Sequence, residues 1–144
     1  MSPAPERFFL DTNIFVYTFD SGSPAKRARA NELVSRAADT RLGVISYQVV
    51  QEFLNLATRK FAKPMRAPEA QFYMDRVLLP LCEVFPDASL YSQALALREE
   101  SQLSFYDSLI VSAALAGDCR ILWTEDLPHK QCIRDLEIRN PFAR

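Results

Sequence analysis

The sequence predicts an α/β protein, a three-layer α/β/α sandwich around a central, mainly parallel sheet of about five strands. Short apolar runs, typical of strands covered on both faces, alternate with longer segments whose apolar residues recur at helical spacing. Such alternation implies right-handed crossovers, which place helices on both sides of a parallel sheet. The chain has 144 residues, of which 49% are hydrophobic, enough for one core. We therefore expect a single domain over 1–144, with 1–6 as a loose tail.

The expected strands are short apolar runs bounded by turn or capping residues. The first run ends directly at Asp11, and the last alternates inward-facing and outward-facing residues. The five strands are expected over 8–10, 42–45, 82–85, 120–123 and 136–139.

The expected helices have recognisable start or stop signals. Ser23 precedes Pro24 at a first helical position, while Ser46, Asp87 and Ser104 are suitable N-caps. Gly117 ends the last helix. Helices are expected over 14–19, 24–39, 47–61, 69–79, from 88 through Leu97, and over 105–116.

Charge and cysteine content limit the class of protein. Lysine plus arginine number 17 against 18 acids, so neither a basic nucleic-acid arm nor an acidic tail is present, and a polyanion would need a local basic patch. The three cysteines are irregularly spaced with no secretory signal before them, which favours reduced thiols in the cytoplasm. No segment approaches the roughly 18 to 20 apolar residues of a membrane span.

Four acids occupy positions that need a special explanation. Asp11 directly follows the first strand, and Asp126, beside Glu125, follows the strand over 120–123. Asp107 lies on the core side of its helix in the first turn, and Glu52 borders the apolar stripe of its helix. Because ligand sites in open α/β sheets lie outside the carboxyl ends of the strands, these acids can converge over one edge of the sheet.

Converging carboxylates need compensation, since burying an unpaired one costs roughly several kcal/mol. Protonation would relieve the repulsion, and so would a divalent cation; oxygen ligands favour Mg²⁺, or Mn²⁺, over zinc. Such a site suits phosphodiester hydrolysis, because a metal polarises the phosphate and helps to generate hydroxide. Taken singly, Asp107 suits a helix start, Glu52 a solvated helix face and Asp126 a turn; their joint arrangement favours a metal site.

Five segments resemble, in the same order, the signatures of PIN-domain proteins, and most closely the toxins of VapBC toxin-antitoxin pairs. They are LDTNIFVY over 10–17, VVQEF over 49–53, SFYDSLIVSAAL over 104–115, ILWTEDL over 121–127 and IRNPF over 138–142. The resemblance implies a Mg²⁺-dependent endoribonuclease that uses metal-activated water. It also implies a homodimer in which two sites share an RNA groove, and a cognate antitoxin protein.

The resemblance also implies roles for individual residues. Asp11 and Asp107 would be the principal metal ligands, with Glu52 a further acid and Asp126 a fourth. Thr124 would orient a carboxylate or a water molecule.

Further supporting roles follow from the same resemblance. Thr12 and Asn13 would shape the turn after the first strand and fix Asp11. The choice between Glu125 and Asp126 as the acid that faces the metal stays open, although the family's spacing favours Asp126. Pro128 and Lys130 replace the smaller residues that the resemblance leads us to expect in the loop after these two acids.

Candidate substrate-binding residues are mostly basic. The RNA backbone would attract cationic side chains, although for any one of them a solvated surface position is equally expected. The candidates are Arg29, Lys60, Lys63, Arg66 and His129. His129 is the sequence's only histidine and is better explained as a solvated loop residue. A zinc site with Cys119 and Cys132 is rejected because no second closely spaced pair exists.

Two other functions compete with the nuclease. In a haloacid-dehalogenase-type phosphatase an aspartate after a strand is the nucleophile, but the usual second aspartate two residues later is here Asn13. A non-catalytic PIN-like RNA-binding scaffold is disfavoured by the intact set of acids.

Overall fold

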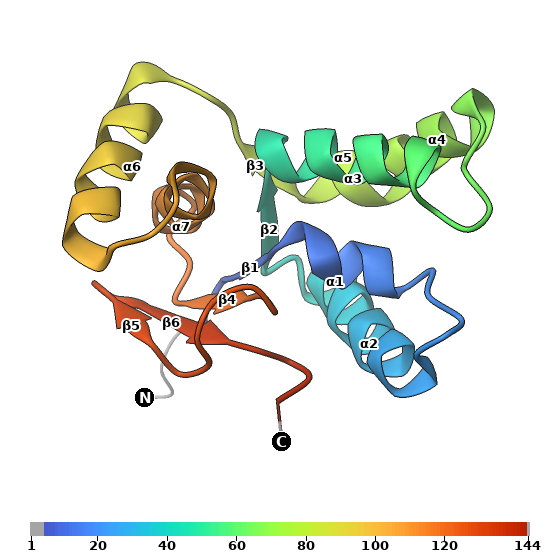
Figure 1. The fold of residues 1–144 in the computed structure, drawn as a ribbon, viewed down its shortest axis with the longest axis horizontal. Helices are drawn as coiled ribbons and strands as arrows, with labels where there is room; N and C mark the ends of the chain where they lie inside the picture. The colour runs from blue at the N-terminus through green and yellow to red at the C-terminus, as the bar shows by residue number, and fades with distance from the viewer. Residues whose placement is uncertain (1–4, 144) are drawn as a thin grey trace.

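Six strands form one mainly parallel sheet in the order β3-β2-β1-β4-β6-β5 in the computed structural model, which describes residues 5–143 (Figure 1). The strands are β1 (Phe8–Leu10), β2 (Gly43–Ser46), β3 (Cys82–Val84), β4 (Ile121–Trp123), β5 (Cys132–Ile133) and β6 (Leu136–Arg139). All neighbouring pairs are parallel except β5 and β6, which pair antiparallel. The predicted architecture is confirmed, with one strand more than the expected five. The additional strand, β5, is too short to show any periodicity in the sequence.

Helices lie on both sides of the sheet. They are α1 (Thr12–Tyr17), α2 (Pro24–Thr40), α3 (Tyr47–Arg59), α4 (Ala67–Tyr73), the π-helical turn η1 (Met74–Leu78), α5 (Leu79–Leu81), α6 (Ala88–Ser101) and α7 (Phe105–Ala116). In Figure 1, α6 and α7 lie together on one side of β1 and β2, while α1 and α2 lie on the other. Of the expected tail, residues 1–4 lie outside the described residues, and Pro5 and Glu6 are exposed without regular structure.

The helix expected over 69–79 is interrupted by η1. The N–H of Leu79 donates to the carbonyl of Met74, five residues earlier, which is the π-helical pattern. Pro80 follows directly. Proline has no N–H to donate to the carbonyl of Arg76, and in a regular α-helix its ring would clash with that carbonyl. A widened turn before a proline therefore replaces a regular helix, a feature that apolar spacing does not reveal.

Two of the expected N-caps make their hydrogen bonds. Asp87 Oδ1 accepts from the N–H of Leu90 at 2.7 Å, and Ser104 Oγ accepts from the N–H of Asp107 at 3.1 Å. Ser46 stands at the N-cap of α3 but makes no capping bond with its side chain. Its hydroxyl is therefore left for another partner.

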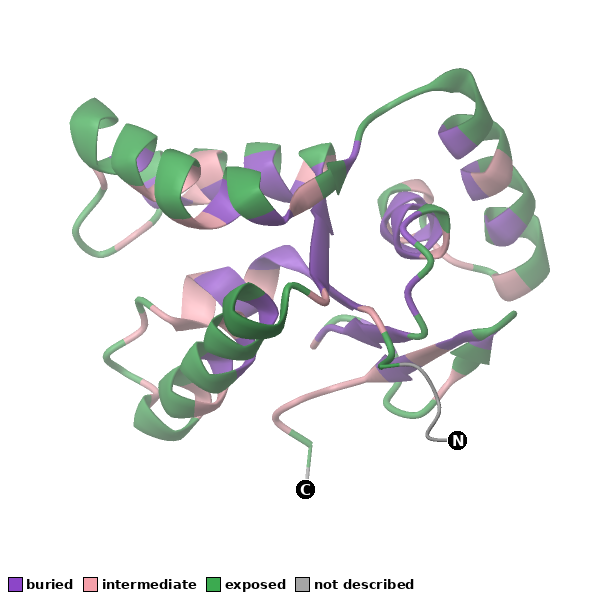
Figure 2. Cartoon of the chain, turned by 180° about the vertical axis from the view of Figure 1, so that it is seen from behind, coloured by how far each residue is buried: buried purple, intermediate pink, exposed green. Residues whose placement is uncertain are grey.

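The core is centred on β1, whose three residues are at most 1% exposed (Figure 2). β2 is packed tightly against α2 through Gly43, where an added Cβ would lie 2.2 Å from the Cβ of Ala37. The N–H of Asp11 donates to the carbonyl of Trp123 at 3.0 Å, which aligns the carboxyl ends of β1 and β4. Among the helices of residues 5–143, none is both long enough and apolar enough to cross a membrane.

Candidate active site

Asp11 lies at the carboxyl end of β1 and is 7% exposed. Its Oδ1 accepts from the N–H of Thr12 at 2.7 Å, which makes Asp11 the N-cap of α1. Its Oδ2 accepts from Thr124 Oγ1, also at 2.7 Å. Both carboxylate oxygens are thus fixed by donors, one from the following helix and one from the end of β4.

The environment of Asp11 disfavours a bare negative charge. The pKa of Asp11 is raised to about 7, chiefly by burial and in part by repulsion from Asp126 and Glu52, although the bonds from Thr124 and Thr12 lower it. A cation beside the carboxylate would remove this penalty.

Thr124 and Asn13 connect Asp11 to Asp126. Thr124 is fully buried, and its Oγ1 accepts from the N–H of Asp126 at 3.0 Å. Asn13 Nδ2 donates to Asp126 Oδ2 at 3.1 Å and to Thr124 Oγ1 at 3.5 Å. Asn13 therefore holds the exposed Asp126 carboxylate, in addition to its expected place in the turn after β1.

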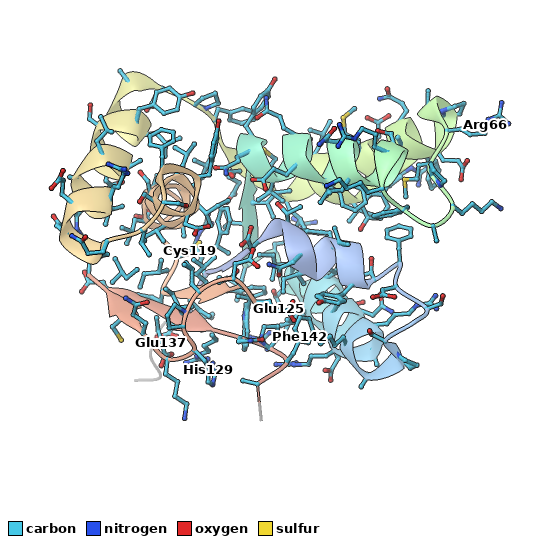
Figure 3. All side chains as sticks on the ribbon, viewed as in Figure 1. Arg66, Cys119, Glu125, His129, Glu137 and Phe142 are labelled. Atoms are coloured by element: carbon cyan, nitrogen blue, oxygen red, sulfur yellow. The ribbon has the colours of Figure 1, made fainter. Side chains whose placement is uncertain are left out.

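Glu125 is directed away from Asp126. Its carboxylate accepts from Tyr17 Oη and from Lys26 Nζ, each at 2.7 Å. Although burial alone would raise it, these two bonds hold the pKa of Glu125 below its ordinary value. The Lys26 ammonium also lies over the rings of Tyr17 and Phe142, at 4.8 and 5.3 Å from their centroids, and Figure 3 labels Glu125 and Phe142 in this region. Glu125 is thus part of an anchor for the loop after β4.

Glu52 and Asp107 approach the same space from helices. Partial burial raises the pKa of Glu52, the nearby Gln48 amide lowers it, and repulsion from Asp126 and Asp107 raises it again. Asp107 is half-buried in the first turn of α7. The charge interactions link all four predicted acids in pairs, Asp11 with Asp126 and Glu52, and Glu52 with Asp126 and Asp107.

The acids supply oxygen donors suited to Mg²⁺, but they do not form a closed cage. Among the described residues, no three acidic, cysteine or histidine side chains lie close enough together to hold a metal ion as they stand. Mg²⁺ does not require a full protein cage, because it keeps several waters and uses one or two carboxylates. The oxygens Thr12 Oγ1 and Asn13 Oδ1 are buried beside Asp11 with no hydrogen-bond partner within residues 5–143. This donor set fits a hydrated hard cation.

The basic candidates are not gathered at the acids. Arg29 Nη1 pairs with Glu32 at 3.1 Å, and its guanidinium lies 5.3 Å from the centroid of the Trp123 ring. Arg66 lies at the far end of the molecule from Glu125 (Figure 3). Lys60 and Lys63 belong to the same distal region, since Lys60 follows Glu52 by eight residues, about 12 Å along a helix axis.

His129 has a structural partner. Its Nδ1 accepts from the N–H of Asn140 at 2.9 Å, so the ring ties the loop after β4 to the C-terminal segment. Two contacts at the site were not predicted. Gln48 had an available signal, since it precedes Glu52 by one helical turn, whereas Lys26 reaches Glu125 across 99 residues and had none.

Residues 8–131 match the PIN domain family, and the chain belongs to this family. Several solved structures similar to this chain have the same fold. A chain of a toxin-antitoxin complex from Klebsiella pneumoniae is 18% identical, with a TM-score of 0.65 over 94% of this chain and 98% of that one. VapC20 of Mycobacterium tuberculosis, a sarcin-ricin loop cleaving toxin, is 20% identical, with a TM-score of 0.59 over 83% and 91%.

A third structure, VapBC2 from Rickettsia felis bound to a DNA fragment from its promoter, is 23% identical, with a TM-score of 0.61 over 92% and 97% of the two chains. Among curated protein sequences, none matches this chain. The predicted PIN resemblance and its likeness to VapC toxins in fold are confirmed.

Proposed function

We propose that this protein is a Mg²⁺-dependent endoribonuclease, able to use Mn²⁺, and the toxin of a toxin-antitoxin pair. The observation that carries the proposal is the buried Asp11 carboxylate, fixed by Thr124 at the carboxyl end of β1, with Asp126 and Glu52 near enough to raise its pKa and Asp107 near Glu52. Membership of the PIN family supports a nuclease, and structural likeness to toxin chains supports the biological class.

Some residues of the site would bind the cation, and others would keep those ligands in position. Asp11, Asp107, Glu52 and Asp126 would hold the cation, and Thr124 and Asn13 would keep Asp11 and Asp126 in place. When bound, the cation supplies the Lewis acidity that phosphodiester hydrolysis needs. Because both oxygens of Asp11 accept hydrogen bonds, this residue is better placed as a ligand than as a nucleophile.

The proposal includes an RNA substrate, a homodimer, a cognate antitoxin and a cytoplasmic location. Toxin-antitoxin complexes among the similar structures support an antitoxin partner. The three cysteines are free within the described part of the chain, which agrees with a reducing compartment.

The test is cleavage of a structured RNA in Mg²⁺ or EDTA by the wild type, by Asp107→Asn and by one matched pair of variants. Asp126→Asn and its neighbour Glu125→Gln remove one charge each, but only Asp126 faces the acids. Metal catalysis contributes several kcal/mol, so Asp107→Asn and Asp126→Asn are expected to lower cleavage about 100-fold or more. Glu125→Gln is expected to retain it.

Cleavage that persists in EDTA, or that is equally insensitive to Asp126→Asn and Glu125→Gln, would contradict the metal-cluster mechanism. Turnover of a small phosphomonoester without RNA cleavage would instead favour the phosphatase. RNA binding without any cleavage in Mg²⁺ or Mn²⁺ would favour the non-catalytic scaffold.

A further inference from the structure

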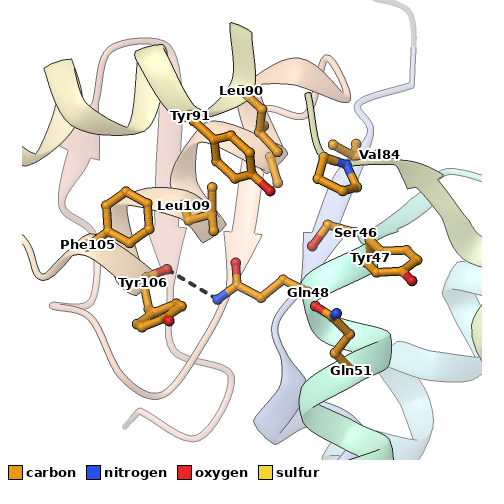
Figure 4. A pocket seen from close by; sticks show the side chains of 12 residues that line it. Ser46, Tyr47, Gln48, Gln51, Val84, Leu90, Tyr91, Phe105, Tyr106 and Leu109 are labelled. Atoms are coloured by element: carbon orange, nitrogen blue, oxygen red, sulfur yellow. Dashed lines mark hydrogen bonds between the residues drawn. The ribbon is translucent and has the colours of Figure 1, made fainter. Parts of the chain in front are cut away.

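A cavity of about 270 Å³ lies beside the acids, between the start of α3 and the helices α6 and α7 (Figure 4). The rings of Tyr91, Phe105 and Tyr106 line one side of it, and Ser46 and Gln48 line the other. No charged side chain is among the described residues that line it. Aliphatic side chains, among them Val84, Leu90 and Leu109, complete the lining, so the cavity is largely aromatic and aliphatic, with a few polar groups and no charge.

Two polar atoms in this cavity have no partner within residues 5–143. They are Ser46 Oγ, on a residue that is 3% exposed, and Gln48 Oε1. The Gln48 amide is oriented by its other end, because Nε2 donates to the carbonyl of Tyr106 at 3.4 Å. Figure 4 shows both oxygens directed toward the space that the rings frame. Buried polar atoms are rarely left unpaired, so these two indicate a ligand with hydrogen-bonding groups.

Two residues that line the cavity are close in sequence to two of the four acids. Gln48 precedes Glu52 by four residues, about 6 Å along α3. Tyr106 directly precedes Asp107 in α7. A ligand in the cavity is thus next to whatever lies at the acids.

We propose that this cavity binds one unpaired base of the RNA strand whose neighbouring phosphodiester lies at the acids. This inference rests on the proposed nuclease function. Flat aromatic side chains stack on splayed single-stranded bases, and buried polar groups bind their edges. Gln48 Oε1 would accept from a base N–H, while the Ser46 hydroxyl would donate or accept.

Other ligand classes fit less well. A phosphate or carboxylate group would find no positive charge in the cavity. An apolar side chain from a protein partner would leave Ser46 Oγ and Gln48 Oε1 unpaired. The volume lies just under the roughly 300 Å³ at which sites for drug-sized ligands begin, which agrees with a ligand as small as one base.

The binding test uses the metal-free chain and four uncharged probes, adenosine, cytidine, guanosine and uridine, which the acids do not repel. The side-chain amide resonances of Gln48 are followed by NMR during each titration. We expect at least one nucleoside to shift them saturably. Loss of one hydrogen bond in Ser46→Ala is expected to weaken that binding about 3- to 10-fold, and loss of stacking in Tyr91→Leu about 10-fold.

The variants have internal controls. The Ser46 side chain makes no capping bond, so Ser46→Ala is expected to unfold at the same denaturant concentration as the wild type. Phe72→Leu alters a ring on α4 that is 62% exposed and outside the cavity, and is expected to bind nucleosides like the wild type.

A second readout separates this proposal from the nuclease function. In Mg²⁺, the wild type is expected to favour one base beside the cleaved bond, and Ser46→Ala to reduce that preference, whereas Phe72→Leu is expected to keep both the preference and the rate of cleavage. Cleavage with no nucleoside binding and no change in preference would overturn the base site alone. Nucleoside binding with no cleavage would overturn the nuclease function and leave the base site standing.

A Gln48 shift that depends only on protein concentration, or that only an antitoxin produces, would assign the cavity to a protein interface and overturn the proposal.

Discussion

The two halves of the acid cluster are built differently. On the strand side, Asp11 and Asp126 are connected through Thr124 and Asn13, and each carboxylate accepts from a side chain. On the helix side, Glu52 has the nearby amide of Gln48 as its one side-chain donor within residues 5–143, and that amide Nε2 also donates to the carbonyl of Tyr106 at 3.4 Å. The strand side is therefore held in place by the fold, whereas the helix side is free to adjust.

The difference indicates a division of labour. A buried, hydrogen-bonded carboxylate fixes the position of a cation, while more exposed acids complete its coordination through water or by rotamer changes. Substitutions on the strand side are therefore expected to change folding stability as well as activity, and those on the helix side to change activity alone.

The largest effect on stability is expected for Asp11→Asn. The pKa of Asp11 is raised from 3.8 unfolded to about 7 folded, so the folded state binds more protons, and its stability falls as pH rises from about 4 to 7. At about 1.4 kcal/mol per pKa unit, the metal-free wild type loses a few kcal/mol over this range. Asp11→Asn is expected to remove most of this dependence and to be the more stable protein at pH 8.

Urea denaturation of both proteins in EDTA at pH 5 and pH 8 measures the effect. Added Mg²⁺ is expected to stabilise the wild type at pH 8, and Asp11→Asn much less. If the stability of the wild type rises between pH 5 and 8 in EDTA, the buried Asp11 carboxylate does not destabilise the metal-free fold as we expect.

Thr124→Val comes next, with an expected cost of about 1–3 kcal/mol. The variant keeps the shape of the side chain but removes the donor to Asp11 and the acceptor for the N–H of Asp126. Thr124→Ser restores the hydroxyl and is expected to recover most of the stability. Thr58→Val is the matched control, because Thr58 is exposed and its hydroxyl bonds only the carbonyl of Leu54. Equal losses in Thr124→Val and Thr58→Val would show that Thr124 does not hold Asp11.

Asn13→Ala is expected to act on metal binding. Without the amide, Asp126 loses its side-chain donor, and groups of this kind typically contribute 10- to 100-fold to metal affinity. We expect Mn²⁺ affinity, measured by calorimetry, to fall about 10-fold, or about 1.4 kcal/mol. Glu125→Gln should leave it unchanged, because Glu125 bonds Tyr17 and Lys26 instead.

The sequence predicted what local patterns encode. The apolar run over 8–10 followed by Asp11 predicted both a buried strand and an acid at its end, and Asp87 and Ser104 predicted helix starts. Features set by distant contacts were out of reach. Glu125 and Asp126 have the same local signals, and it is Lys26 and Tyr17, 99 and 108 residues away, that direct Glu125 outward.

Two further limits have the same origin. The two-residue β5 carries no periodicity, and the π-helical turn over 74–78 is a hydrogen-bond shift that leaves the apolar spacing intact. Ser46 was expected to cap α3, yet its hydroxyl is turned into the cavity. The sequence thus placed Ser46 correctly at the start of α3, but it could not show that the hydroxyl faces a cavity formed by distant helices.

The smallest effects on stability are expected on the helix side. Glu52 and Asp107 are only partly buried, and no backbone N–H within residues 5–143 fixes either carboxylate, so Glu52→Gln and Asp107→Asn should change the unfolding free energy by no more than about 0.5 kcal/mol. For Glu52→Gln the change should be slightly stabilising in EDTA, because repulsion from Asp126 and Asp107 is relieved. Urea denaturation and RNA cleavage on the same samples decide the point. Loss of cleavage with unchanged stability would support a mobile helix side, whereas a destabilisation as large as that of Thr124→Val would mean that both halves of the cluster are structural.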